Sequence, residues 1–296
     1  MTSVGVIAHA RKTLDGGLRD LRAVLAKHGV EDPLWREVPK SKLMPEKVEE
    51  LVGAGVDLLF VWGGDGSVQR TIDAVRKAPV TLAILPAGTA NLFATNLGIP
   101  ADLEEAVRIG LHGDRRALDV GSVNGERFGV MAGTGFDAIM IREADAGLKG
   151  RLGRVAYVVS GVRGVGRDPV QTSVKVDGAS WFEGPATCVL VGNMGDVIGG
   201  ISAFPDAAPD DGRLNVGVVT ADGLIDWART LGRTAVGHAA SSPFVETTTA
   251  AKVDVLLDTK TPYELDGGDR PATKRLKFRV KPAAIRVCFP EGSERA

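Results

Sequence analysis

The sequence predicts an α/β fold, in which a doubly wound parallel sheet precedes a second domain of mainly antiparallel strands. Two observations predict it. Apolar strands and amphipathic helices alternate up to Leu111 with short links between them, and repeated βα units of this kind form parallel sheets. After Arg115, short strands separated by Gly, Pro or Asp turns follow instead, which is typical of antiparallel sheets.

The elements of the first part alternate regularly. Val56–Trp62 is continuously apolar after Asp57, as expected when both faces of a parallel sheet are covered. Pro45 suits the first turn of a helix, and Gly29 suits a helix stop. The expected strands are Val4–Ala8, Glu31–Val38, Val56–Trp62 and Thr81–Leu85. The expected helices are Gly17–His28, Pro45–Gly53, Ser67–Lys77, Asn91–Leu97 and Asp102–Leu111.

The second part is expected to be β-rich. Two segments have helical spacing instead, Phe136–Val165 and Leu224–His238. We predict a nucleotide-binding domain over 1–118, rejoined by 281–296, and a lipid-substrate domain over 119–280. The expected strands are Ala117–Val123, Glu126–Ala132, Thr172–Val176, Trp181–Val191, Leu214–Thr220, Lys252–Asp258, Lys274–Val280 and Ala284–Phe289.

Composition limits the class of protein. Of the 296 residues, 44% are hydrophobic and 25% charged, as in globular proteins with real cores. The net charge of −1 gives no electrostatic case for nucleic acid. Cys188 and Cys288 are too few for a disulfide framework or a zinc cluster, so we expect a reducing cytoplasm. "MTSVGVIAHA" indicates a buried strand rather than a signal peptide, and no run approaches the ~20 apolar residues of a membrane span.

A glycine-rich stretch follows the third expected strand: Gly63, Gly64, Asp65, Gly66 and Ser67. Between a buried strand and a helix, backbone N–H groups can converge on a phosphate, and glycines let the backbone approach it. Ser67 can cap the helix or contact phosphate. The stretch matches neither the P-loop nor the dinucleotide fingerprint. The alternative is a glycine turn whose Asp side chain bonds its own backbone.

A second loop, "PAGTAN" at Pro86–Asn91, follows the next expected strand. In open parallel sheets, ligands bind outside the carboxyl ends of the strands. Two such loops from adjacent strands can therefore form opposite walls of a nucleotide cleft. Thr89 and Asn91 would supply hydrogen bonds, or would cap the helix that follows.

Together, "GGDGSVQRTIDAV" and "ILPAGTANLFATNLGIP" resemble the catalytic domain of the diacylglycerol kinase family, which includes soluble bacterial lipid kinases and the sphingosine and ceramide kinases. The family motifs are GGDGT and P-x-GT-x-N-x-x-A, and Ser67 replaces the threonine. "VGNMGDVIGGISAFPDAAPDDGRLNVGVV" resembles the family's Gly-Asn, Gly-Gly, Pro-x-Ala and Asp-Gly-x-Leu segment. "YELDGGDRP" falls where the family carries a strand ending in Asp-Gly-Glu. The resemblance covers nearly the whole chain in the family's order.

This resemblance implies a kinase that uses ATP and Mg²⁺ to phosphorylate a lipid alcohol, with diacylglycerol as the expected substrate and phosphatidic acid as the product of a step in phospholipid biosynthesis. It implies a phosphofructokinase-like nucleotide domain, a β-rich second domain and a site between them. The expected location is the cytoplasm, peripheral to the inner face of the membrane. A sphingoid base or another lipid alcohol remains an alternative substrate.

The resemblance also implies roles for individual residues. Asp65 would act near Mg-ATP, and Asp266 would accept the proton of the substrate hydroxyl. Asp211 would belong to a Mg²⁺ site, completed by main-chain oxygens near Ala208 and Arg213. The residues expected to line the ATP site are Gly63, Gly64, Asp65, Gly66, Ser67, Gln69, Arg70, Gly88, Thr89 and Asn91.

Two departures from the family pattern matter. The chain has "AHARK" at Ala8–Lys12 where the family often has Asn-Pro, and Gly268 stands in place of the glutamate of Asp-Gly-Glu. We hypothesise that Asp269 partly substitutes, or that Asp266 alone suffices. The alternative interpretation of "LDGGDRP" is a hairpin turn, because Asp-Gly between strands is a strong hairpin signal.

Two further segments are open to two interpretations. Ser41, in "PKSK", follows the second expected strand and either touches phosphate or lies in a solvated loop. Gly147–Arg167 carries five cations and no acid, with apolar residues near helical spacing. Such a helix can lie on an anionic membrane surface or pack on the β-rich domain.

Three readings of the whole protein remain. The first is the lipid kinase. The second is an NAD kinase, which shares a GGDG loop and a similar architecture, although the "PAGTAN" and Asp-Gly-x-Leu segments favour the lipid kinase. The third is a non-catalytic nucleotide- or lipid-binding regulator, supported by Gly268. Nothing in the sequence fixes the oligomeric state, and a homodimer stays open.

Overall fold

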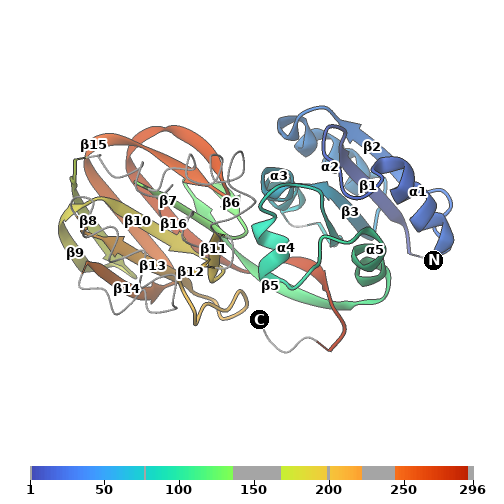
Figure 1. Cartoon of the computed structure of the whole chain (residues 1–296). Coiled ribbons are helices and arrows are strands. Elements are labelled where there is room, and N and C mark those ends of the chain that lie inside the picture. Colours follow the sequence, from blue (N-terminus) through green and yellow to red (C-terminus); the bar gives the residue numbers. More distant parts are fainter. Residues whose placement is uncertain (1, 77, 136–167, 199–200, 222–243, 293–296) are drawn as a thin grey trace, which may run out of the picture. The chain divides into compact units, whose positions relative to one another are not determined.

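The computed structural model describes residues 2–76, 78–135, 168–198, 201–221 and 244–292 (Figure 1). The chain divides into two compact units, one made of Met1–Val120 with Pro282–Ala296 and the other of Gly121–Lys281. The chain passes from one unit to the other on two strands, β5 (Asp114–Val123) and β16 (Gly268–Phe289).

The first unit contains a parallel sheet. Its strands are β1 (Val4–His9), β2 (Leu34–Val38), β3 (Leu58–Gly63) and β4 (Thr81–Pro86), in the order β2-β1-β3-β4. All three neighbouring pairs are parallel. The end of β16 adds a fifth strand, with Arg286 opposite Thr81. The parallel sheet predicted from alternating strands and helices is confirmed.

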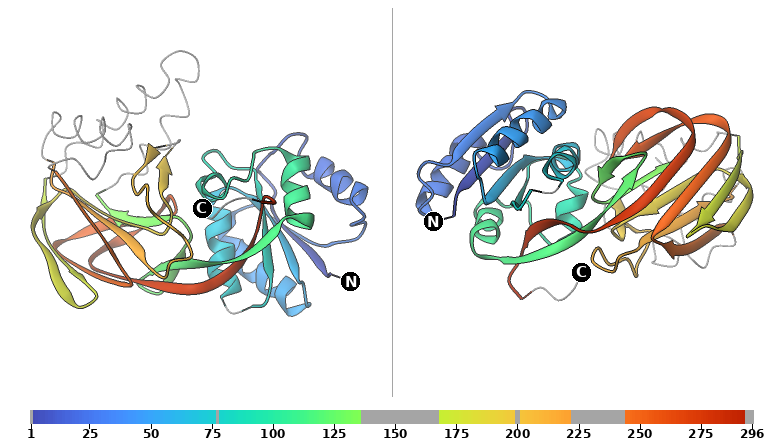
Figure 2. Two further views of the ribbon diagram at one scale, coloured as in Figure 1. Left: turned by 90° about the horizontal axis from the view of Figure 1, so that it is seen from below. Right: turned by 180° about the vertical axis from the view of Figure 1, so that it is seen from behind.

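Helices cover both faces of this sheet. They are α1 (Leu18–Lys27), α2 (Met44–Gly53), α3 (Asp65–Val75), α4 (Leu92–Asn96) and α5 (Leu103–His112), with a short 3₁₀ helix, η1 (Ser41–Leu43), before α2. α1 packs with α5 and α2 packs with α3, on opposite faces of the sheet (Figure 2). This is the doubly wound arrangement that the sequence predicted.

The centre of the first unit is mainly apolar. Every residue of β3 and β4 is buried, including Phe60 and Trp62. Gly110 of α5 faces this sheet, and a Cβ there would overlap the ring of Phe60. The helix can therefore pack closely on the strands that carry the two glycine loops.

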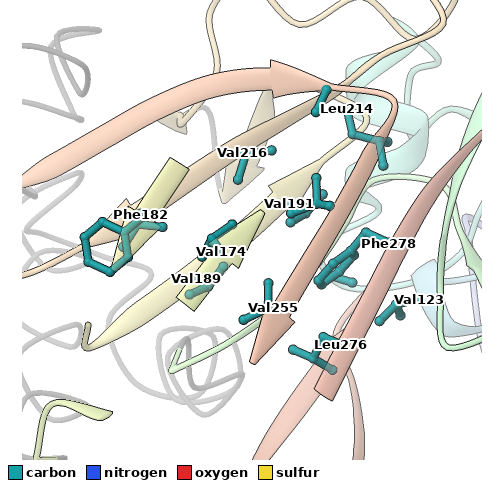
Figure 3. Packing of buried hydrophobic residues seen from close by; sticks show 14 of the residues in the cluster. Val123, Val174, Phe182, Val189, Val191, Leu214, Val216, Val255, Leu276 and Phe278 are labelled. Carbon is teal, nitrogen blue, oxygen red and sulfur yellow. The ribbon is translucent and has the colours of Figure 1, made fainter. Parts of the chain in front are cut away.

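The second unit is an antiparallel β structure. Its main path runs β14-β13-β10-β7-β15-β16. β8 pairs with β15 and β9 with β8, while β5 pairs with β16 and β6 with β5. Its core consists of inward-facing aliphatic and aromatic side chains such as Val191, Val216 and Phe278 (Figure 3). The strands are β6 (Glu126–Phe128), β7 (Met131–Thr134), β8 (Val170–Val176), β9 (Ala179–Ala186), β10 (Cys188–Gly192), β11 (Asp196–Ile198), β12 (Ile201–Ser202), β13 (Leu214–Val219), β14 (Val245–Ala250) and β15 (Lys252–Leu265).

Several predicted strand boundaries are wrong. Lys274–Val280 and Ala284–Phe289 are parts of the single strand β16. The chain bends at Ala283, whose φ is +45°, and the Asp119 carboxylate accepts its N–H at 2.8 Å. The predicted strand Trp181–Val191 is two strands, because Thr187 between them bonds Val219 through its N–H and its hydroxyl.

Three hairpins of the second unit share one turn design. Asn124–Gly125, Asp177–Gly178 and Asp266–Gly267 each have positive φ at both residues, as two-residue type I′ turns require. Asp177 Oδ1 accepts the N–H groups of Ala251 and Lys252. The side chains of Asn124 and Asp266 likewise bond backbone groups of a neighbouring segment. In each case the first turn residue thus ties its hairpin to another part of the sheet.

Candidate active site

The two glycine loops leave the sheet at the same level. β3 ends at Gly63 and β4 at Pro86, and these two residues are partners in the parallel register. The N–H of Ala87 donates to the Gly63 carbonyl at 3.0 Å and continues this pairing into the loops. The prediction that both loops lie at one edge of the sheet is confirmed.

The loops touch backbone to backbone at Gly64 and Gly88. A Cβ added to Gly64 would lie 3.0 Å from the Cα of Gly88. A Cβ on Gly88 would overlap the Cα of Gly64 and lie 2.6 Å from Asn91 Oδ1. Neither position has room for a side chain. Gly66 differs, because the nearest atom to an added Cβ is Ser41 Oγ at 4.0 Å.

Asn91 holds the second loop in shape. Its backbone is left-handed, with φ +50°, a conformation that asparagine tolerates. Its Oδ1 accepts the N–H of Gly88 at 2.8 Å, and its Nδ2 donates to the carbonyls of Pro86 and Gly88. It makes no side-chain bond that caps α4. Of the two roles expected for Asn91, capping is therefore wrong, and its amide is used within its own loop.

Asp65 caps α4 in place of Asn91. Its Oδ1 accepts the N–H of Phe93 at 3.1 Å, so a residue of the first loop satisfies the helix that follows the second. Burial raises the pKa of the Asp65 carboxyl, and bonds from the amides of Phe93 and its neighbours oppose this in part. Asp65 thus ties the loops together, and its action near Mg-ATP stays a prediction.

The pKa of Asp65 leads to a test of stability. Because the folded pKa lies above the unfolded one, this group favours folding only at low pH, and that contribution is lost as pH rises through the folded value. Asparagine keeps the oxygen that accepts the Phe93 N–H and carries no charge. We therefore expect Asp65→Asn to raise Tm at pH 8, with the gain fading towards pH 4.

Thermal unfolding of wild type, Asp65→Asn and Asp65→Ala at both pH values makes the comparison. Alanine also removes the cap, which should cost about 1 kcal/mol. A lower Tm for Asp65→Asn than for wild type at pH 8 would show that the negative charge itself stabilises the loops.

The other residues predicted for the ATP site divide into two groups. Ser67 and Gln69 are 3% and 2% exposed, and their side chains lie in the interior. The N-cap position of α3 is Gly64 and no side chain bonds there as a cap, so the capping role expected for Ser67 is wrong. Arg70 is half-buried and Thr89 is exposed. Ser41 lies beside Gly66.

Asp266 occupies the Asp-Gly turn between β15 and β16, where Leu265 pairs with Gly268. The hairpin turn, which was the alternative interpretation of this segment, is therefore present, and the role of Asp266 as proton acceptor stays a prediction. The residue is 7% exposed. Its carboxylate accepts the N–H groups of Gly129, Val130 and Met131 at 2.7, 3.0 and 3.0 Å. Three donors therefore fix the orientation of this carboxylate.

Asn193 holds the same segment from the other side. It is completely buried, and its Nδ2 donates to the carbonyl of Gly129 while its N–H donates to Val130. The Asp266 N–H donates to Met131. The Gly-Asn motif thus has a structural role beside Asp266, which local sequence patterns do not reveal because the two motifs lie far apart along the chain.

Gly268 and Asp269 lie on opposite faces of β16, because successive residues of a strand alternate. Asp269 is exposed. Arg270 lies on the same face as Gly268, and a Cβ added to Gly268 would lie 2.9 Å from Arg270 Nη1. This geometry does not support the hypothesis that Asp269 takes the place of the family glutamate.

Asp211 lies in the exposed turn before β13. Its Oδ1 accepts the N–H of Arg213 at 2.8 Å, and the Arg213 guanidinium bonds Thr249. Within the part of the chain that the structure describes, no group of three or more His, Cys, Asp or Glu side chains could hold a metal ion. A Mg²⁺ site here would depend on Asp211 and on main-chain oxygens near Ala208 and Arg213, and it stays a prediction.

Some predictions lie outside the described residues, namely the basic segment Gly147–Arg167, Gly199-Gly200 and the two helical segments Phe136–Val165 and Leu224–His238. In the described ranges, no helix combines the length and the apolar character needed to cross a membrane.

Comparison with known proteins gives consistent findings. Residues 9–123 match the diacylglycerol kinase catalytic domain, and residues 130–289 match the YegS C-terminal NAD kinase beta sandwich-like domain. A protein named "Probable lipid kinase YegS-like" from Shewanella frigidimarina (strain NCIMB 400) is 28% identical over 300 residues, which are 98% of this chain and 94% of that protein. One of the same name from Pseudomonas aeruginosa (strain UCBPP-PA14) is 32% identical over 255 residues, 83% and 81% of the two chains.

A solved structure agrees at the level of the fold. A protein from Bacillus anthracis str. Sterne, provisionally named a diacylglycerol kinase, has a TM-score of 0.81 at 23% identity, covering 97% of this chain and 95% of its own. The similarity extends over both units of the chain.

Proposed function

This chain belongs to the family of lipid kinases that join a diacylglycerol kinase catalytic domain to a YegS C-terminal domain, and from this premise we propose that it transfers the γ-phosphoryl group of Mg-ATP to a lipid hydroxyl. Diacylglycerol is the proposed substrate and phosphatidic acid the product. The enzyme would work in the cytoplasm, at the inner face of the membrane.

The contact between Gly64 and Gly88 carries the proposal. Two loops whose glycines meet without side chains lie together at the start of α3, where Gly66 is exposed. The first N–H groups of a helix have no intrahelical partners and attract anions. Gly66, where an added Cβ has no protein atom closer than 4.0 Å, is the residue we assign to the closest approach of a phosphate.

Asp266 is the group that we assign to the lipid hydroxyl. In phosphoryl transfer the protein mainly positions the reactants, because the transition state is loose. A carboxylate fixed by three amide donors can orient a hydroxyl as it attacks phosphorus. The new P–O bond to the lipid forms as the bond to ADP breaks, and the hydroxyl proton passes to Asp266.

Mg²⁺ would neutralise the phosphates when bound. Asp211 offers a hard oxygen ligand on an exposed turn, which fits a magnesium site completed by carbonyls and water. Asp65 would face Mg-ATP directly or through water while holding the two loops together.

Labelled ATP with Mg²⁺ tests the proposal when the protein receives diacylglycerol, a sphingoid base, other lipid alcohols and NAD in separate reactions. We expect label in phosphatidic acid. Label only in a phosphorylated sphingoid base or another lipid alcohol would keep the kinase and change the substrate.

Label in NADP alone would contradict the lipid kinase and support the NAD kinase, an alternative that the similarity of residues 130–289 to an NAD kinase-like sandwich keeps open. Bound ATP without transfer to any acceptor would favour the non-catalytic regulator.

A further inference from the structure

We propose that Glu126 and Arg270 form a positioning pair that holds the Asp266 turn in its working geometry. This rests on the proposed function, in which Asp266 orients the lipid hydroxyl. Arg270 lies within the "YELDGGDRP" segment and Glu126 on another strand, and neither has been given a role so far.

The pair has the geometry of a strong interaction. Arg270 Nε donates to Glu126 Oε2 at 2.7 Å, and Nη2 donates to Oε1, so the guanidinium binds the carboxylate with two parallel bonds. The side chains are only 13% and 29% exposed. Two-pronged Arg–carboxylate pairs fix orientation as well as adding energy. Glu126 also raises the pKa of Arg270.

Arg270 also grips the strand that leaves the turn. Its Nη1 donates to the carbonyls of Gly268 and Asp269, both at 3.0 Å. The guanidinium thus has two partners. One is the backbone between Asp266 and Arg270, and the other is the Glu126 side chain. Lysine cannot make this set of bonds, because its ammonium is a single point of charge.

The two ends of the pair lie on the two segments that Asp266 joins. Glu126 begins β6, three residues before Gly129, whose N–H the Asp266 carboxylate accepts at 2.7 Å. Arg270 follows Asp266 by four residues on β16. The segments 126–131 and 266–270 are therefore tied at two points, and the second tie limits how far the turn can rotate about the first.

Gly268 leaves the space that this arrangement needs. A Cβ there would lie 2.9 Å from Arg270 Nη1 and 3.3 Å from the Leu265 carbonyl. A side chain at this position would displace the guanidinium from the carbonyl it binds. In this chain, Gly268 and Arg270 are thus structurally dependent on each other.

The test compares Arg270→Lys with Arg279→Lys. Arg279 lies on the same strand, bonds Asp254 at 2.8 Å, and donates to the carbonyls of Val253 and Phe278, so it provides a control pair of similar chemistry away from the turn. We expect Arg270→Lys to lower kcat for the lipid about tenfold, with KM for ATP within about twofold, because misplacing a reacting group slows catalysis without weakening ATP binding. Arg279→Lys should leave kcat unchanged.

A second readout does not depend on activity. The amide proton resonances of Gly129, Val130 and Met131 report the bonds to Asp266, and NMR should show them moving in Arg270→Lys but not in Arg279→Lys. Glu126→Gln and Gly268→Ala should give the same shifts. In double variants, neither Glu126→Gln nor Gly268→Ala should add to the effect of Arg270→Lys, because all three substitutions act on the same contact.

Unchanged kcat and unchanged resonances in Arg270→Lys would overturn the proposal, as would equal changes in both lysine variants. If instead the proposed function is wrong, the wild-type protein itself will transfer no phosphate to a lipid, so the two failures can be told apart. The resonances would still decide whether the pair holds the turn.

Discussion

Replacing Asp266 with asparagine should lower kcat for lipid phosphorylation at least about hundredfold, the usual effect of losing a positioned proton acceptor. In the wild type, the three amide donors of Gly129, Val130 and Met131 face the two oxygens of the Asp266 carboxylate. Asparagine would replace one oxygen with an N–H₂ group that points at donors. At least one buried amide would then lack an acceptor, and each such loss costs about 1–3 kcal/mol. We therefore expect both a lower Tm and a lower kcat.

Asp177→Ala, which removes the acceptor altogether, separates these two effects. Asp177 occupies the same type of turn, and its Oδ1 accepts the N–H groups of Ala251 and Lys252 at 3.0 and 2.9 Å. Loss of these two bonds should lower Tm and leave kcat unchanged. ATP affinity, measured by calorimetry, should stay within about twofold of wild type in both variants, because ATP is assigned to the other unit. Full kinase activity in Asp266→Asn would exclude Asp266 as the proton acceptor.

Replacing Gly88 with alanine should weaken ATP binding about a hundredfold, a loss of about 2.7 kcal/mol. The new methyl group would overlap the Cα of Gly64, and a backbone atom cannot turn aside as a side chain can. The loops would have to separate, and the bonds from Asn91 to Gly88 would be distorted. Overpacking of this kind typically costs about 1–3 kcal/mol of stability.

Two other glycines provide the controls, with ATP affinity measured by calorimetry and stability by thermal unfolding. Gly53→Ala adds a methyl group where no heavy atom lies within 4 Å, and it should change neither quantity much. Gly66→Ala is the sharper variant, because the protein has room for the methyl group. A large loss of ATP affinity with an unchanged Tm would show that the ligand itself comes close to Gly66. Normal ATP affinity in both Gly66→Ala and Gly88→Ala would exclude this loop pair as the phosphate site.

The sequence could predict the loops but not their roles in detail. Gly63–Ser67 and Pro86–Asn91 follow buried strands that are adjacent in the sheet, and strand periodicity with glycine content is enough to expect this. That Asp65 caps α4 while Asn91 binds its own loop could not be foreseen. The local sequence suggested Asn91 as the cap of α4. Whether Asn91 or Asp65 accepts the helix N–H depends on which of the two side chains the fold brings to the start of that helix.

Long-range pairing explains the other misses. β14 was not predicted, because "VETTTA" lacks apolar alternation, and it is a strand because it pairs along β13. Two strands were predicted at Lys274–Val280 and Ala284–Phe289, but the chain runs through as the single strand β16, with the N–H of Ala283 bonded to Asp119. In both cases a partner more than 25 residues away along the chain supplies the hydrogen bonds, and local sequence carries no signal for it.

The sequence by itself determined the class of fold and the family, because strand and helix periodicity and the glycine motifs are local patterns that survive large changes elsewhere. Tertiary structure alone decided what Asp266 touches, how Asn193 and Gly129 meet, and why Gly268 is a glycine. The contacts of Asp266 and Asn193 join residues more than sixty positions apart, and only the packing of the sheet brings them within hydrogen-bonding distance. Gly268 lies two positions from the Arg270 guanidinium that crowds it, and that guanidinium is held in place by Glu126 of another strand. The Glu126–Arg270 pair is likewise decided by tertiary structure, since its two residues lie 144 positions apart along the chain.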